Sequence, residues 1–139
     1  MKKHKTENPI EEVGDYMTPS PLTIDSDQTI QSAAHFMHSN QVGSLVVKQN
    51  GKPAGIVTER DFTRKVLAKG LDQNKATVSD IMTAPFHSID CHESVLDANK
   101  LMAKKKIRHL VVTENDEVVG ILSVKDLVHY FSNPRIRSF

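Results

Sequence analysis

The sequence predicts a mixed α/β fold, of the α+β kind, in which two copies of one β-α-β-β-α unit pack as a single module. Three observations support this: identical residues recur at a constant spacing, apolar residues form helical stripes, and β-branched residues form short paired runs. Met82 stands 65 positions after Met17. The same spacing joins Asp25 to Asp90, Leu45 to Leu110, Gly55 to Gly120 and Asp61 to Asp126.

Each copy starts with a short extended segment and continues into a helix. The extended segments are residues 22–24 and 88–89. Ile30, Ala33 and Met37 then follow the spacing of one apolar helix face, and residues 95–102 repeat that spacing in the second copy. We therefore expect a helix of about three turns in each copy.

A β-hairpin and a second helix complete each copy. The hairpin strands are the β-branched runs 45–47 with 54–57 and 110–112 with 118–122. Asn50-Gly51 and Asn115-Asp116 lie between the strands, and these residue types accept the positive φ of a tight turn. The second helices are expected over 59–69, ending at Gly70, and over 124–131.

These elements divide the chain into two repeats with polar connections. The first repeat covers residues 15–70 and the second covers 78–132, with a polar linker over 71–77. A polar N-terminal segment, 1–14, is expected to fray, and 133–139 forms a C-terminal tail. Because each repeat is too small to bury its own apolar face, the two should pack together as one domain.

Composition excludes several classes of protein. The chain has 139 residues, with 38% apolar and 25% charged residues and a net charge of +1, so neither a disordered polyelectrolyte nor a broad nucleic-acid surface is expected. Cys91 is the single cysteine and cannot form an intrachain disulfide. No secretory signal and no membrane-spanning apolar stretch is visible, which predicts a cytoplasmic protein without membrane contact.

The pattern Gly-x-x-Thr/Ser-x-x-Asp occurs at Gly55–Asp61 and again at Gly120–Asp126. A hydroxyl residue followed three positions later by an acid is a capping box, which satisfies free amides at a helix start. The same residues also suit a nucleotide, because a helix N-terminus with a hydroxyl binds phosphate and a carboxylate accepts ribose hydroxyls. Glycine would let another group approach the backbone closely.

The repeat and this motif together resemble the tandem cystathionine-beta-synthase (CBS) domain pair, or Bateman module. The resemblance also covers Asp15–Pro19 and Asp80–Thr83 as opening turns and Lys106–Val112 as a second strand. It implies a pseudo-twofold pair with two clefts, a homodimer, and noncatalytic regulation by an adenosyl ligand such as AMP, ADP or ATP, with no required cofactor. The downstream effector is not identified by the sequence.

The resemblance also implies which residues would bind the ligand in each cleft. The first cleft would combine Thr58 and Asp61 with Phe86, His87, Ile107, Arg108, His109, Val111 and Lys125. The second would combine Ser123 and Asp126 with Leu22, Thr23, Val42, Val46 and Arg60. The first cleft has more cations to face a phosphate, and the sequence therefore favours Asp61 as the acceptor of a phosphorylated ligand.

The residues also suggest three other functions. The cationic run 104–109 could attract nucleic acid, but cations at a helix end offset the helix dipole, and the neutral net charge favours that explanation. His87, Cys91 and His92 could hold zinc with His35 or His38, but their spacing is irregular and no metal is expected. Cys91 is expected at a helix entrance, which would lower its thiol pKa if exposed and would permit redox sensing.

Two rivals of another class remain beside ligand sensing. One is a scaffold that dimerises without any ligand. The apolar residues of the second helices are expected to form the dimer contact: Phe62, Val66, Leu67, Leu127, Val128 and Phe131. The other is an enzyme, which we do not expect, because neither copy supplies a nucleophile with an adjacent base and an orienting acid.

Overall fold

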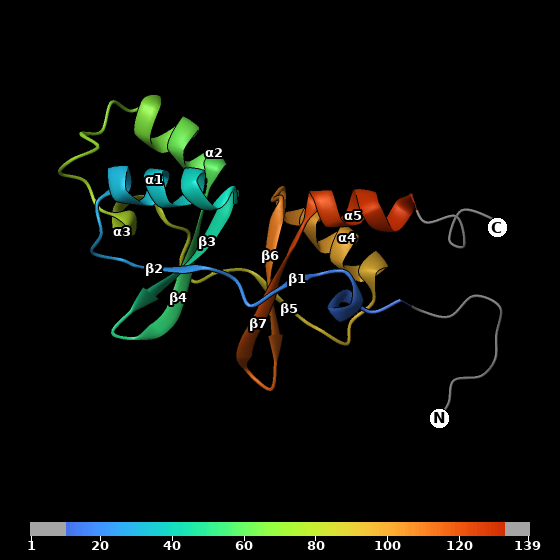
Figure 1. The fold of residues 1–139 in the computed structure, drawn as a ribbon. Coiled ribbons are helices and arrows are strands. Elements are labelled where there is room, and N and C mark those ends of the chain that lie inside the picture. Colours follow the sequence, from blue (N-terminus) through green and yellow to red (C-terminus); the bar gives the residue numbers. More distant parts are fainter. Residues whose placement is uncertain (1–10, 133–139) are drawn as a thin grey trace, which may run out of the picture. The chain divides into compact units, whose positions relative to one another are not determined.

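The computed structural model describes residues 11–132, which form two compact units (Figure 1). The first unit is Pro21–Phe86, and the second joins the described part of Met1–Ser20 to the described part of His87–Phe139. Each unit contains one β-α-β-β-α sequence with a sheet and helices, which confirms the predicted mixed fold. None of the helices in these residues is long and apolar enough to cross a lipid bilayer.

The first unit contains a three-stranded sheet of order β2-β3-β4, with β2 parallel and β4 antiparallel to β3. The strands are β2 (Thr23–Asp25), β3 (Ser44–Gln49) and β4 (Lys52–Thr58). The helices are α1 (Ile30–Asn40), α2 (Glu59–Asp61), the π-helix η2 (Phe62–Leu67) and α3 (Val78–Ile81). The apolar face of α1 packs on Leu45, Val47 and Val57 of the hairpin in one buried cluster.

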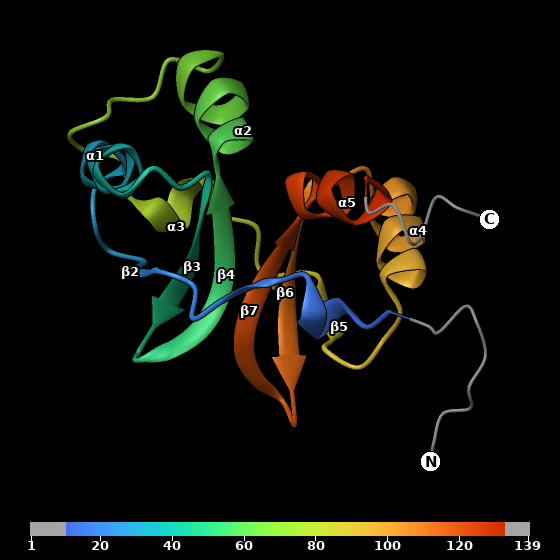
Figure 2. The same cartoon turned by 45° about the vertical axis from the view of Figure 1, so that its right-hand side comes forward.

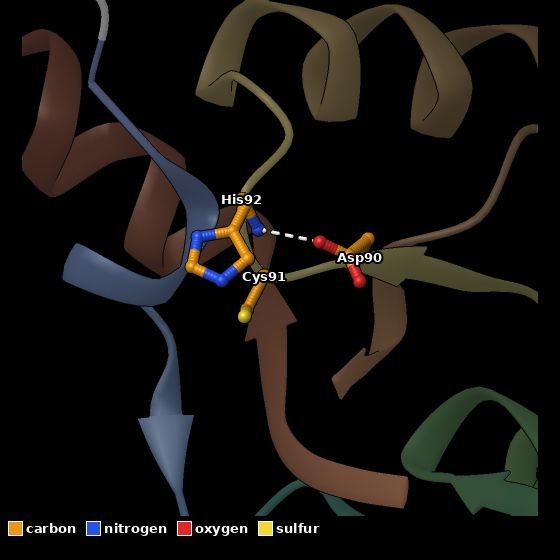
Figure 3. Close-up of side chains that lie close together, drawn as sticks. All are labelled: Asp90, Cys91 and His92. Atoms are coloured by element: carbon orange, nitrogen blue, oxygen red, sulfur yellow. Dashed lines mark hydrogen bonds between the residues drawn. The ribbon is translucent and has the colours of Figure 1, made fainter. Parts of the chain in front are cut away.

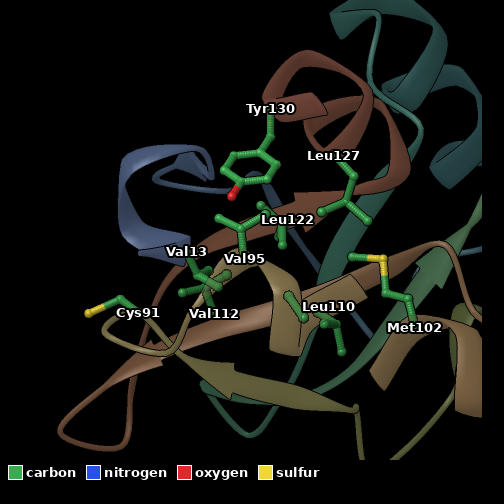
Figure 4. Close-up of a cluster of buried hydrophobic side chains, with 10 residues drawn as sticks. Val13, Cys91, Val95, Met102, Leu110, Val112, Leu122, Leu127 and Tyr130 are labelled. Atoms are coloured by element: carbon green, nitrogen blue, oxygen red, sulfur yellow. The ribbon is translucent and has the colours of Figure 1, made fainter. Parts of the chain in front are cut away.

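The second unit contains a four-stranded sheet of order β1-β7-β6-β5. Its elements are η1 (Val13–Asp15), β1 (Thr18–Pro19), β5 (Ser88–Asp90), α4 (Val95–Lys105), β6 (His109–Glu114), β7 (Glu117–Ser123) and α5 (Val124–Phe131). Helices α4 and α5 lie on the same side of the β6–β7 hairpin (Figure 2). Their apolar residues meet Leu110, Val112 and Leu122 in a second buried cluster (Figure 4).

The predicted first helices, hairpins and turns are confirmed. Thr29 and Ser94 cap α1 and α4 by accepting hydrogen bonds from the amides of Ser32 and Asp97. Both hairpin turns use the residues with positive φ that the sequence indicated, at Asn50-Gly51 and Asn115-Asp116. The helix expected over 124–131 is α5. Because each of these elements is encoded by neighbouring residues, local patterns suffice to find it.

The second helix of the first repeat differs from its prediction as one helix over 59–69. It begins as α2, but after Asp61 the chain widens into the π-helix Phe62–Leu67. The amide of Ala68 then bonds to the carbonyl of Thr63, five residues earlier. Its apolar residues do not all pack alike, since Val66 is buried whereas Leu67 is 77% exposed. Helix α3, at the start of the second repeat, is too short to show a period and was not predicted.

The N-terminal segment 1–14 was predicted to fray, and this prediction is wrong for residues 11–14, which the structure describes. Val13 is fully buried among Val95, Leu122 and Tyr130, as Figure 4 shows. The amides of Val13 and Gly14 donate to the carbonyls of Glu93 and Cys91, each at 2.8 Å. A single valine in a polar segment has no periodicity, so the sequence pattern gave no sign of this contact. Residues 1–10 and the predicted tail over 133–139 lie outside the described residues.

The opening segment of each repeat pairs with a strand of the other repeat. β1 pairs with β7 of the second unit, with Thr18 opposite Ile121 and Pro19 opposite Gly120. In the first unit Thr83 forms the matching bridge to Ile56, with two backbone hydrogen bonds of 2.9 and 3.0 Å. The compact units therefore divide after Ser20 and after Phe86, whereas the predicted boundaries 15–70 and 78–132 follow the sequence repeat.

Candidate functional site

The two Gly-x-x-Thr/Ser-x-x-Asp motifs lie at the same place in both units, where the last hairpin strand becomes a helix. In the first unit the amide of Thr58 donates to Asp61 Oδ2 at 2.8 Å, and the Thr58 hydroxyl donates to the same oxygen at 3.4 Å. Asp61 is only 8% exposed. The capping interpretation of the first motif is therefore confirmed, with Oδ2 committed to the helix start.

The other carboxylate oxygen of Asp61 is also occupied. Lys65, one helical turn further on, places its Nζ 3.1 Å from Asp61 Oδ1. The same ammonium donates to the carbonyl of Ile81 at 2.9 Å, which fixes the side chain in this position. An Asp and a Lys four residues apart are the sequence signal for such a pair. The pair was not predicted, because Lys65 lies outside the Gly-x-x-Thr-x-x-Asp motif that contains Asp61.

The motif of the second unit has the same cap but a different neighbour. Asp126 Oδ2 accepts hydrogen bonds from the amide of Ser123 at 2.7 Å and from its hydroxyl at 3.1 Å. The residue equivalent to Lys65 is Tyr130, which is buried in the core and packs edge-on against Tyr16, with ring centroids 5.1 Å apart. Within the described residues no protein group donates to Asp126 Oδ1, and no cation pairs with it.

The motif glycines do allow a close approach, and the group that approaches is the chain itself. A Cβ on Gly55 would lie 2.7 Å from the carbonyl oxygen of Thr83. A Cβ on Gly120 would lie 2.8 Å from the carbonyl oxygen of Thr18 and 2.5 Å from Met17 Sδ. Both glycines therefore have a structural role in seating the opening segment of each repeat, because no larger residue leaves room for it.

The remaining candidate residues form equivalent groups in the two units. In the first unit Thr23 is opposite Val46, and the carbonyl of Leu22 accepts from the Val46 amide at 3.0 Å. In the second unit the carbonyl of His87 accepts from the Val111 amide at 3.0 Å. Val46 and Val111 alternate with the core residues on either side of them, so they lie on the sheet face opposite the helices.

Each predicted cleft combines candidates from both units, and each unit is described by itself. The first unit holds Leu22, Thr23, Val42, Val46, Thr58, Arg60, Asp61 and Phe86. The second unit holds His87, Ile107, Arg108, His109, Val111, Ser123, Lys125 and Asp126. The carbonyl of Arg108 accepts from the Val124 amide at 3.0 Å, so this residue lies beside the start of α5 and the second motif.

The cationic run 104–109 begins in the last turn of α4, as the helix-dipole explanation requires, and ends at the first residue of β6. Lys104 and Lys105 are in the last helical turn, and Lys106 is the left-handed cap residue with φ of 57°. Cations in this position interact favourably with the negative end of the helix dipole.

His87, Cys91 and His92 were the candidates for zinc, and the structure changes their grouping. Donor atoms of Asp90, Cys91 and His92 all lie within 4.8 Å of one another (Figure 3). His92 Nδ1 is 3.0 Å from Glu12 Oε1, and Nε2 is 3.1 Å from Glu114 Oε2. These two carboxylates raise the pKa of His92. His35 and His38 are exposed on α1 of the first unit.

The condition for a lowered thiol pKa at Cys91, exposure to solvent, is not met. Cys91 is only 7% exposed and belongs to the core cluster of the second unit. Burial, followed by the nearby carboxylates of Glu114 and Asp90, raises the pKa of the Cys91 thiol. The thiol is therefore protonated at neutral pH and a poor nucleophile, because the thiolate is the reactive form.

The sequence profile of the CBS domain family matches residues 13–68 and 78–133. The chain belongs to the CBS domain family. It is 36% identical over 122 residues to the CBS domain-containing protein YhcV of Bacillus subtilis, covering 87% of this chain and 86% of that protein. CBS pairs of this kind are generally regulatory ligand-binding modules and not catalysts.

Solved structures of CBS proteins have the same fold. The hexameric CBS-CP12 protein from bloom-forming cyanobacteria aligns with a TM-score of 0.81 and 30% identity, covering 86% of this chain and 67% of that one. Hypoxic Response Protein I, solved with two coordinated zinc ions, aligns with a TM-score of 0.72 and 26% identity, covering 86% of this chain and 98% of that one.

The second unit of this CBS pair also carries an apolar groove between α4 and α5. The groove has a volume of about 460 Å³. Three residues of α5 at its side are substantially exposed: Val124 at 41%, Val128 at 59% and Phe131 at 40%. Of the helix residues expected in a dimer contact, three are thus exposed, Phe62 is half-buried and two are buried. The exposed ones are Leu67, Val128 and Phe131, and the buried ones are Val66 and Leu127.

Proposed function

We propose that this CBS pair is a noncatalytic sensor that binds an adenosyl ligand, such as AMP, ADP or ATP, through its capped carboxylates. The observation that carries the proposal is the state of Asp126. Its Oδ2 closes the cap of α5, while Oδ1 has no protein donor in the described part of the chain. A ribose presents two hydroxyl donors, and an ionised carboxylate with a vacant oxygen at a helix N-terminus is a suitable acceptor.

The cation pattern of the sequence favoured Asp61, but the contacts in the structure support Asp126. A ribose hydroxyl that bonds to Asp61 Oδ1 must displace Lys65, which sits 3.1 Å from it. This displacement costs an ion pair of a nearly buried carboxylate and a hydrogen bond to Ile81. At Asp126 no such exchange is needed. We therefore assign the primary ribose acceptor to Asp126, with Ser123 beside the phosphate.

The family resemblance supplies the other members of each proposed site. Leu22, Thr23, Val42 and Val46 would contact the base of the ligand at Asp126, with Arg60 toward its phosphate. Phe86, His87, Ile107, Arg108, His109, Val111 and Lys125 would complete the weaker site at Thr58 and Asp61.

Sensing also needs an output, and we propose that the chain forms a homodimer through α5. The exposed Val124, Val128 and Phe131 form one stripe along this helix beside the groove. A second copy of the chain is the proposed occupant, since a twofold dimer pairs the same surface of both copies and would cover one apolar stripe with the other. One structural relative forms a hexamer, so association between copies does occur in this family.

Val128→Asp should convert the dimer to a monomer. An aspartate at the centre of an apolar contact leaves a charge without a partner, which should weaken association by about 2 kcal/mol or more, or about thirtyfold. Light scattering at a protein concentration on the order of tens of micromolar should give the mass of two chains for the unmodified protein and of one chain for the variant. Leu96→Asp is the matched control, because Leu96 is 51% exposed on α4 and does not line the groove. A single-chain mass for the unmodified protein would contradict the dimer.

Mass spectrometry of small molecules released from the purified, denatured protein tests the ligand. The proposal predicts an adenosyl compound in the released fraction. A different compound in an amount comparable to the protein would contradict the adenosyl assignment. A dimeric protein that releases no compound and gains no thermal stability from adenine nucleotides would favour the rival function, a scaffold that dimerises without ligand through the same apolar groove.

A further inference from the structure

Five potential metal donors meet at one edge of the second unit, and they come from three separate parts of the chain. Asp90, Cys91 and His92 lie where β5 ends and the turn before α4 begins. Glu12 precedes η1, and Glu114 ends β6. Figure 3 shows the Cys91 sulfur on the same side as the imidazole ring of His92. We call Glu12, Asp90, Cys91, His92 and Glu114 the donor cluster.

The distances within the donor cluster are close to those of a metal site. The donor atoms of Asp90, Cys91 and His92 lie within 4.8 Å of one another. Bond lengths of about 2.0 to 2.3 Å in a tetrahedral zinc site place its ligands about 3.5 Å apart. These three donor atoms would therefore have to move closer together on binding a metal. The amide of His92 donates to Asp90 Oδ2 at 2.9 Å, which holds this carboxylate at the cluster.

The two glutamates orient the imidazole as a metal-bound histidine requires. In metal sites, the ring nitrogen that does not bind the metal donates its proton to a carboxylate or carbonyl. His92 has a carboxylate at each nitrogen, Glu12 at 3.0 Å and Glu114 at 3.1 Å. Whichever nitrogen binds the metal, the other keeps such a partner. The glutamate that the metal displaces from the other ring nitrogen can itself supply a carboxylate oxygen as a ligand to that metal.

We propose that the donor cluster is a binding site for a divalent cation of the zinc type, with Cys91, His92 and Asp90 as ligands and one glutamate as the fourth. A set of thiolate, imidazole and carboxylate donors suits Zn²⁺ and Co²⁺ better than Mg²⁺ or Ca²⁺, which prefer oxygen alone. The side chains of His92, Glu12 and Glu114 are open to solution at 63%, 47% and 46% exposed, whereas Cys91, at 7%, is the inner ligand. Binding replaces the thiol proton, which leaves to solvent, while the neutral imidazole binds through its unprotonated ring nitrogen.

A metal at this position would join the start of the described chain to the second sheet. Glu12 is bridged to Ser94 and is followed by Val13, which is seated in the core. The cation would add a link from this segment to β5 and β6. The site lies wholly in the second unit and does not depend on whether a nucleotide binds at Asp126 or Asp61.

Titration of the chelator-treated full chain with Co²⁺ tests the proposal directly, because thiolate bound to Co²⁺ gives a charge-transfer absorption in the near ultraviolet. We expect this band to saturate at one Co²⁺ per chain and Zn²⁺ to abolish it by displacement. Cys91→Ser should remove the band, and His92→Gln should weaken Co²⁺ binding at least a hundredfold. Glu12→Gln together with Glu114→Gln should weaken it about tenfold to a hundredfold, the range for residues that orient a ligand.

His35→Gln is the matched control, since His35 is an exposed histidine on α1 of the other unit, and it should leave the titration unchanged. Circular dichroism of each variant without metal shows whether it is folded, and a variant that does not fold is replaced by Cys91→Ala or His92→Asn. The absence of a thiolate band, or a band that persists in the folded His92 variant, would overturn the proposal. Co²⁺ binding that is the same in Cys91→Ser and in the unmodified chain would also overturn it.

Discussion

Gly120→Ala should lower the free energy of unfolding by about 2 to 3 kcal/mol, the upper part of the range for overpacked cores. The new Cβ would lie 2.8 Å from the carbonyl oxygen of Thr18 and 2.5 Å from Met17 Sδ. Met17 could rotate away, but the Thr18 carbonyl is backbone of β1, which pairs with β7 at this point. The sheet must therefore shift. Gly55→Ala should have a similar effect, since its Cβ would be 2.7 Å from the carbonyl oxygen of Thr83.

Gly43→Ala is the control for this prediction. Its Cβ would approach a single side chain, with the Glu59 Oε1 atom 3.0 Å away, and that flexible carboxylate can move. Urea denaturation of the three variants measures the free energies of unfolding. If the Gly55 and Gly120 variants lose no more unfolding free energy than the Gly43 variant, the opening segments of the repeats are not seated on the motif glycines. The motif glycines would then have to be explained by the ligand alone.

Asp126→Asn should weaken binding of an adenosyl ligand about tenfold or more, while Asp61→Asn should have little effect. Hydrogen bonds to a charged acceptor contribute about 1.5 to 3 kcal/mol, and an amide in place of the carboxylate loses much of that. The carbonyl oxygen of the introduced side chain can still accept from the Ser123 amide, so folding should change by about 1 kcal/mol or less. Calorimetric titration of both variants with AMP and ATP measures the affinities.

A third variant separates the two carboxylates further. Lys65→Met removes the ammonium from Asp61 Oδ1 while keeping an apolar stem of similar length. If the ion pair blocks the first acceptor, this variant should gain a second binding event, and adding Asp61→Asn should abolish it. A loss of affinity confined to Asp61→Asn would show that the sequence-based choice of Asp61 was right and that Lys65 does not block it.

Local patterns gave most of the fold, because most elements are built from residues close together in sequence. Capped helices such as α1 and tight hairpin turns such as Asn50-Gly51 depend on a few neighbouring side chains. The burial of Val13 depends on residues about eighty positions away or more, including Val95 and Leu122. The pairing of β1 with β7 likewise joins residues that are far apart in the sequence. No pattern within the segment could reveal either contact.

The sequence predicted the motifs of the candidate site but not the contacts that their carboxylates make. The sequence correctly identified both capping boxes. Because the two motifs are alike, the sequence suggested that Asp61 and Asp126 have similar surroundings. The structure shows that Lys65 pairs with Asp61, whereas Tyr130, in the equivalent position, lies in the core beside Tyr16. The histidine network of Glu12, His92 and Glu114 was missed for a related reason, since its members are distant in sequence.

Calorimetric titration of the ligand-free, unmodified chain with AMP, ADP, ATP and S-adenosylmethionine is the most direct test of the central claim. The claim predicts saturable binding of at least one of these compounds and a rise in melting temperature at saturating concentration, because a ligand that binds only the folded state stabilises it. A folded, dimeric chain that shows neither heat of binding nor thermal stabilisation with any of the four would contradict the claim that this CBS pair senses an adenosyl ligand.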